Sequence, residues 1–135
     1  METSGVLILL IDDDPFFRRV LGDAFKESGF SIITAENGQE GVRLFREHRP
    51  AAVLCDLVMP GMGGVSTCQA IAVEAAPEEP VMVLLTSMFK EPPHEHPTAE
   101  MGARVHIPKF CNPVDIVILV EQLLARERYR TDNAS

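Results

Sequence analysis

Three short runs of the chain are apolar at every position, and they constrain the fold more than any other feature. They are VLILLI (6–11), AAVLC (51–55) and VMVLL (81–85). A strand with one face in water alternates polar with apolar residues, whereas a strand covered on both faces is continuously apolar. These runs therefore predict central strands of a sheet with helices on both sides. Two weaker runs, FSIIT (30–34) and ARVHI (103–107), predict two further strands.

Helical patterns lie between the predicted strands, and each begins at a residue that suits a helix start. We expect helices from Asp14 and Pro15 to Gly29, from Asn37 to about His48, from about Gly64 to Ala76, and from Asn112 and Pro113 onward. Strands that alternate with helices form right-handed crossovers and a parallel sheet. The sequence therefore predicts an α/β fold with helices on both faces of the sheet.

Composition indicates one globular domain. The chain has 135 residues, of which 46% are hydrophobic and 24% charged. No apolar run approaches the roughly 20 residues of a membrane-spanning helix, and METSGV lacks the features of a secretory signal, so we expect a cytoplasmic protein without membrane contact. The net charge of −8 argues against direct nucleic-acid binding by this domain. Cys55, Cys68 and Cys111 form no CxxC pair and are expected to be free thiols.

Charged and polar residues gather at the ends of the predicted strands. Asp12, Asp13, Asp56, Thr86 and Lys109 each follow one of them, and ligands of open parallel sheets bind at this edge. An aspartate before a proline and a helical run, as at position 14, is expected to be a helix cap. Two further adjacent carboxylates repel each other unless a cation compensates them, and Mg²⁺ prefers such ligands. A solvated acidic turn is the alternative for this pair.

At these positions the sequence resembles the receiver domain of bacterial two-component response regulators, the CheY-like superfamily. The resemblance covers about residues 5–125. It rests on the acidic pair Asp12 and Asp13 together with LCDLVMPGMGG (54–64), LLTS (84–87) and IPKF (107–110), in this order. It implies a flavodoxin-like (βα)5 doubly wound sheet of strand order 2-1-3-4-5. It also implies a receiver domain over residues 1–125, with 126–135 as a polar tail or the start of a linker to an effector domain.

The resemblance further implies a site chemistry. Asp56 is the expected acceptor of a phosphoryl group, which a histidine kinase or phosphotransfer protein supplies, and the domain is not expected to turn over an external substrate. Mg²⁺ is expected on Asp13, Asp56 and the backbone carbonyl of Val58, with Asp12 acting mostly through water. Lys109 and the Thr86 hydroxyl would contact phosphoryl oxygens.

Two backbone amides and a switch residue complete the expected site. The amides of Leu57 and Ser87 are plausible further donors to a phosphoryl group. When Thr86 moves toward that group, the family's aromatic residue on the fifth strand fills the space behind it, and His106 occupies the matching position. A half-buried histidine without such a role is the alternative. The switch would act on the surface formed by the fourth helix, the fifth strand and the fifth helix.

The lysine motif departs from the family pattern. Phe110 follows Lys109 where the family has a proline in a cis peptide, and Pro108 precedes it. A cis bond before a residue other than proline costs about 2.5–4 kcal/mol. The loop is therefore expected to be either trans and rearranged or strained.

The segment expected to form the fourth helix also departs. Residues 88–101 contain Pro92, Pro93 and Pro97, which predict an irregular loop or a shortened helix. His94 and His96 in this segment are expected to be solvated and not to bind a metal. Residues 114–124, VDIVILVEQLL, are apolar nearly all round. They predict a homodimer or effector-domain contact through this helix, or deeper burial of the helix.

Two other functions are compatible with the motifs. The segment LLIDDDP also resembles the nucleophile segment of haloacid dehalogenase-type phosphatases, with Asp12 as nucleophile and Asp14 as general acid. The proline after Asp14 and the lack of a second acidic pair near the C-terminus argue against it. A receiver-like adaptor that works without phosphorylation is the other alternative. The complete set of acidic, hydroxyl and lysine residues favours the phosphoacceptor.

Overall fold

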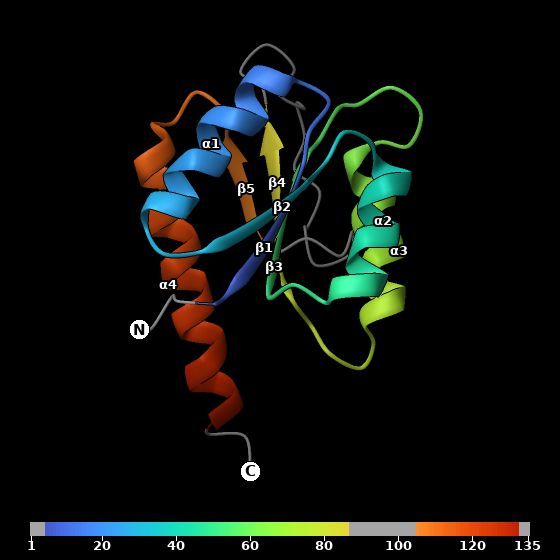
Figure 1. The fold of residues 1–135 in the computed structure, drawn as a ribbon. Coiled ribbons are helices and arrows are strands. Elements are labelled where there is room, and N and C mark those ends of the chain that lie inside the picture. The colour runs from blue at the N-terminus through green and yellow to red at the C-terminus, as the bar shows by residue number, and fades with distance from the viewer. Residues whose placement is uncertain (1–4, 87–104, 133–135) are drawn as a thin grey trace.

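The computed structural model describes residues 5–86 and 105–132, and they form a five-stranded parallel sheet between two helical layers (Figure 1). The strand order is β2-β1-β3-β4-β5, which confirms the predicted flavodoxin-like topology. The strands are β1 (Leu7–Ile11), β2 (Ser31–Ala35), β3 (Ala52–Asp56), β4 (Val81–Thr86) and β5 (Val105–Pro108). The three continuous apolar runs form the central strands β1, β3 and β4, and the weaker runs form the two edges.

Four helices within residues 5–86 and 105–132 cover the sheet in pairs. They are α1 (Pro15–Glu27), α2 (Gly38–His48), α3 (Gly64–Ala75) and α4 (Pro113–Asp132). Figure 1 shows α1 and α4 on one face of the sheet and α2 and α3 on the other. The predicted irregular or shortened helix within residues 88–101 lies outside the described residues, as do His94 and His96.

Each face of the sheet carries its own hydrophobic core, which explains why the central strands lack polar residues. Successive side chains of a strand point to opposite faces. In β1, Ile8 and Leu10 pack in the core under α1 and α4, while Leu9 and Ile11 pack in the core under α2 and α3. All four side chains are fully buried. A polar residue at any of these positions would face a helix and not water.

The helix starts follow the predicted caps. The Asp14 carboxylate accepts hydrogen bonds from the backbone N–H groups of Phe16 at 3.0 Å and Phe17 at 3.4 Å. Asn37 accepts one from the N–H of Glu40 at 2.8 Å. These bonds satisfy N–H groups that have no partner within the helix. They also fix the turn between β1 and α1, which carries the acidic pair.

The last helix is buried on one side only. Ile116, Val117, Val120 and Leu124 face the core, and three other large apolar side chains of α4 are exposed: Val114 by 58%, Ile118 by 43% and Leu119 by 41%. The helix extends to Asp132, through part of the segment predicted as a tail or linker, and the domain boundary after residue 125 stays a prediction. In the described part of the chain, no helix combines the length and hydropathy that a bilayer crossing requires.

Candidate functional site

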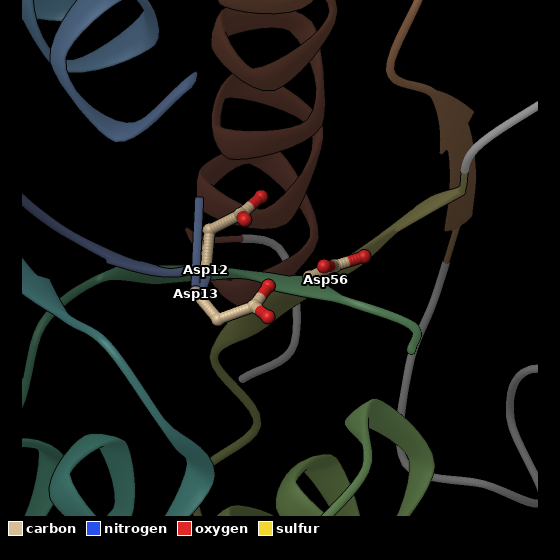
Figure 2. A group of neighbouring side chains, drawn as sticks. All are labelled: Asp12, Asp13 and Asp56. Atoms are coloured by element: carbon tan, nitrogen blue, oxygen red, sulfur yellow. The ribbon is translucent and has the colours of Figure 1, made fainter. Parts of the chain in front are cut away.

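Three carboxylates meet where two neighbouring strands end. Ile11 of β1 pairs with Cys55 of β3, so the next residue of each strand places Asp12 beside Asp56. Asp13 follows on the same turn, and carboxylate oxygens of the three residues lie within 4.8 Å of one another. Figure 2 shows Asp12 and Asp13 projecting from the end of β1 and Asp56 from the end of β3. The sequence prediction that separate loops bring these acids together is confirmed.

The three acids differ in exposure. Asp12 is 0% exposed and Asp56 is 6% exposed, whereas Asp13 lies at the surface. The Asp12 carboxylate accepts a hydrogen bond from the N–H of Asp14 at 2.9 Å, and its backbone carbonyl accepts one from the Arg18 guanidinium at 2.6 Å. Asp12 is therefore held rigidly, and Asp13 is the member of the pair that solvent or an incoming ligand reaches.

Lys109 directly follows the edge strand β5, and its side chain extends to these acids. Its backbone N–H donates to the carbonyl of Thr86 at 2.7 Å, which fixes the start of the loop after β5. Its Nζ lies 2.9 Å from Oδ2 of Asp12 and 3.7 Å from Oδ2 of Asp56. Within residues 5–86 and 105–132 the only cis peptide is Ala76–Pro77, so the peptide between Lys109 and Phe110 is trans. The lysine reaches the acids without the family's cis-proline.

The electrostatics of the site favour binding of a further cation. Burial, followed by the charge of Asp12, raises the pKa of Asp56 from its ordinary 3.8 to about 6. Burial also raises the pKa of Asp12. Burial alone would lower the pKa of Lys109, but its hydrogen bond to Asp12 and the carboxylate charges outweigh burial and raise it. Three carboxylates against one ammonium leave an excess of negative charge, which desolvation makes costly.

The donor set suits a hard divalent cation. Mg²⁺ binds through one or two carboxylates, phosphate oxygens and water, and the exposed Asp13 with the neighbouring Asp56 offers such ligands. Val58 is the first residue of the following loop to contact the site, because its N–H donates to Oδ1 of Asp56 at 3.4 Å. The role of its carbonyl as a metal ligand stays a prediction.

One predicted amide donor is wrong, and the structure identifies a better one. The N–H of Leu57 donates to the carbonyl of Leu85 at 2.9 Å, so it extends the pairing of β3 with β4 and is not directed at the acceptor. The N–H of Val58 points at the Asp56 carboxylate instead. Alternation along an extended chain gives the reason, since successive N–H groups point in opposite directions and only the second one turns back. Ser87, the other predicted donor, lies outside the described residues.

Thr86 and His106 lie on adjacent strands behind the site. Thr86 is the last residue of β4, one position beyond Leu85, which pairs with Asp56. It is buried, with 9% of its surface exposed. His106 pairs with Leu84 in β5 and is partly buried. Its Nε2 atom is buried and has no hydrogen-bond partner in the described part of the chain. The switch roles of both residues stay predictions.

The geometry argues against the phosphatase alternative. The predicted nucleophile, Asp12, is fully buried and paired with Lys109. The predicted general acid, Asp14, uses its carboxylate to cap α1. A nucleophile and a general acid must each be able to reach an external phosphate ester. The ion pair of Asp12 and the helix cap of Asp14 leave neither carboxylate free for these two roles.

Comparisons with known proteins identify the family to which the chain is similar. The family model described as response regulator receiver domain matches residues 8–121. The chain is 29% identical over 133 residues to the probable transcriptional regulator ycf27 of Porphyra purpurea, a match covering 98% of this chain and 53% of that protein. It is 30% identical over 125 residues to the transcriptional regulatory protein ResD of Bacillus subtilis, covering 93% of this chain and 50% of ResD. The chain thus spans about half the length of these relatives.

A solved structure shares the fold of this chain. The chemotaxis protein CheY4 of Vibrio cholerae superimposes with a TM-score of 0.80 at 19% sequence identity. The match covers 88% of this chain and 98% of CheY4. At this identity the likeness concerns the arrangement of strands and helices.

Proposed function

Because the chain belongs to the response regulator receiver domain family, we propose that it accepts a phosphoryl group on Asp56 in two-component signal transduction. The donor is the phosphohistidine of a histidine kinase or phosphotransfer protein, and the reaction depends on Mg²⁺. The observation that carries the proposal is the position of Lys109, whose Nζ lies between the buried Asp12 and the acceptor Asp56. From this position the ammonium group can offset negative charge on a group transferred to Asp56.

The transfer itself requires an ionised acceptor and neutralised phosphoryl oxygens. An Asp56 oxygen attacks the phosphorus, the P–N bond breaks, and its electron pair leaves with the imidazole nitrogen. With a pKa of about 6, the carboxyl of Asp56 is largely ionised at pH 7 even before a cation binds. Lys109 and the N–H of Val58 then stabilise charge on the transferred group. Thr86, at the end of β4, is proposed as a further donor.

The cation site is proposed on Asp13 and Asp56, with the Val58 carbonyl as a third protein ligand and Asp12 acting through water. The excess of negative charge at the three acids supports it. When bound, Mg²⁺ supplies positive charge to the phosphoryl oxygens. Asp12 contributes mainly by holding Lys109, since the two side chains form the shortest ion pair of the site.

The output surface is proposed to include β5 and α4. A phosphoryl group draws the Thr86 hydroxyl toward it, and His106 turns into the space left behind β4. The exposed Val114, Ile118 and Leu119 of α4 support a contact of this surface with an effector domain or a second copy of the chain. The net charge of −8 supports a role in which this cytoplasmic domain does not itself bind nucleic acid.

Intact-mass spectrometry after incubation with acetyl phosphate and Mg²⁺ tests the proposal. We expect one added phosphoryl group on the wild-type protein. It should not form when Mg²⁺ is left out of the incubation, and it should be absent in Asp56→Asn. Asp14→Asn is the matched control, because Asn caps a helix as well as Asp does and should keep the label. A label that persists in Asp56→Asn would place the acceptor elsewhere. A wild-type protein that takes no label from acetyl phosphate or from a phosphorylated kinase would support the adaptor function instead.

A further inference from the structure

The ring of Phe17 lies beneath the ammonium group of Lys109. Nζ is 4.4 Å from the ring centroid, and it also lies 2.9 Å from Asp12 and 3.7 Å from Asp56. We propose that Phe17 is a positioning residue for phosphoryl transfer: its aromatic face holds the Lys109 ammonium group beside the acceptor carboxylate. The inference rests on the proposed function of Asp56 and adds a residue that does not touch the transferred group.

Lys109 needs such support because its chain neighbours supply little. A lysine ammonium ends a flexible four-carbon stem, and holding it in one place costs side-chain entropy. The backbone is fixed by the bond from its N–H to the Thr86 carbonyl. Beyond it, the peptide to Phe110 is trans and the Phe110 side chain is 66% exposed. The residue after the lysine therefore does not pack against the site.

An aromatic face suits this task better than another carboxylate. The negative face of the ring attracts the ammonium group without neutralising it and without occupying one specific N–H direction. Lys109 therefore keeps its donors for Asp12 and, after transfer, for a phosphoryl oxygen on Asp56. Lys109 is 18% exposed, so water weakens the attraction less than at an open surface. An aliphatic side chain of similar size would fill the space but attract no charge.

Phe17 is itself held rigidly by the start of α1. Its N–H donates to the Asp14 cap at 3.4 Å, and its ring packs against the core on the α1 and α4 face of the sheet. The next residue, Arg18, ties the helix back to the carbonyl of Asp12 at 2.6 Å. One helical turn thus fixes both the ring beneath the lysine and the acid that pairs with it.

Fluorinated phenylalanines at position 17 test the inference with almost no change of shape. Successive fluorine atoms withdraw charge from the ring face, so the initial rate of phosphorylation by acetyl phosphate at saturating Mg²⁺ should fall with each addition. Phe17→Leu should lower this rate roughly three- to tenfold, equivalent to about 0.7–1.4 kcal/mol, while the final extent of labelling is kept. Phe17→Trp, with a stronger aromatic face, should restore most of the rate lost in Phe17→Leu.

Two controls separate positioning from packing. Phe16→Leu changes the neighbouring ring, which is 74% exposed, and should leave the rate unchanged. In a Lys109→Met background, Phe17→Leu should have no further effect on the residual rate, because no cation remains to be held. A flat fluorine series, or an undiminished effect of Phe17→Leu in that background, would overturn the role of Phe17. These outcomes leave labelling of Asp56 intact, whereas failure of the proposed function appears as an unlabelled wild-type protein.

Discussion

Ile11 and Asp12 are neighbours at the end of β1, and both are 0% exposed. Ile11 packs in the core beneath α2 and α3, where removing apolar surface from water stabilises the fold. Asp12 has lost its water to the same extent, but a buried carboxylate costs free energy even beside Lys109. Burial of Ile11 therefore stabilises the fold, whereas burial of the next residue, Asp12, lowers stability and is explained by its role in the site.

The same contrast holds for β3, where Leu54 lies in the core and Asp56 at the site. The raised pKa of Asp56 reflects the free-energy cost of keeping its carboxylate ionised at this position, since burial and the charge of Asp12 both oppose the ionised form. A cation bound at the three acids would offset part of this repulsion. The strand interiors thus stabilise the scaffold that keeps the repelling acids together. Changes in the two regions should have opposite effects on stability and activity.

The largest expected effect lies in the strand interior. Leu54→Ala removes a fully buried side chain and should lower the free energy of unfolding by about 2–5 kcal/mol. Urea denaturation followed by circular dichroism measures the loss. Val73→Ala is the control, because Val73 is 78% exposed on α3 and its truncation should change little. Phosphorylation of Leu54→Ala should persist well below its melting temperature; loss of labelling in the folded variant would show that core and site are not separable.

Removing the charge of Asp56 at the end of β3 should stabilise the folded protein, whereas Leu54→Ala should destabilise it. Without Mg²⁺, Asp56→Asn should raise the free energy of unfolding at pH 7 by about 1–3 kcal/mol, because the pKa of this carboxyl is about 6 in the folded protein and 3.8 ordinarily. Between these values the folded protein binds more protons than the unfolded chain, so wild-type stability falls as pH rises. The advantage of Asp56→Asn should accordingly grow from near zero at about pH 4 to its full size above pH 6.

Urea denaturation of both proteins at several pH values checks this dependence. Asp23→Asn serves as the control, since Asp23 is exposed on α1 and away from the acids. Its stability relative to wild type should not follow the same pH profile. If Asp56→Asn were destabilising at pH 7, the idea that the acids repel one another in the folded state would have to be abandoned.

Binding of Mg²⁺ should reduce the loss of stability that the repelling acids cause at the strand ends. A ligand at ten times its dissociation constant stabilises the folded state by about 1.4 kcal/mol, so Mg²⁺ should raise the melting temperature of the wild-type protein. Asp13→Ala should lose most of this response, because Asp13 is the exposed acid of the site. Differential scanning calorimetry over a Mg²⁺ titration makes the measurement. Equal responses of wild type and Asp13→Ala would exclude a site at these carboxylates.

The sequence predicts the strand interiors better than the site because the two depend on different ranges of interaction. Whether a strand is covered on both faces is apparent from its own residues, and the runs ending at Ile11, Cys55 and Leu85 were placed within a residue or two. Caps such as Asp14 and Asn37 are equally local. Because parallel strands end at one edge, the meeting of Asp12, Asp13 and Asp56 also followed from the sequence.

What the sequence could not supply are the directions of individual groups. The choice between the N–H of Leu57 and that of Val58 depends on which one continues the ladder to β4. Phe17 lies within the helix predicted to end at Gly29, and its contact with Lys109 joins positions 92 residues apart, the difference between 109 and 17. A possible signal was the aromatic residue one turn after the acidic pair. No local sequence pattern shows which strand end supplies the cation that contacts this ring, here Lys109.

The smallest expected effect comes from Asp14, the third aspartate of the run, which belongs with the scaffold and not with the site. Its carboxylate is exposed and caps α1 through two N–H groups. Asp14→Ala should therefore lower the free energy of unfolding by about 1 kcal/mol, while Asp14→Asn should keep the cap and the stability. Both variants should reach the wild-type extent of phosphorylation, as judged by intact mass. An Asp14→Ala protein of unchanged stability that no longer takes the label would assign Asp14 to the chemistry and move the boundary between site and scaffold by one residue.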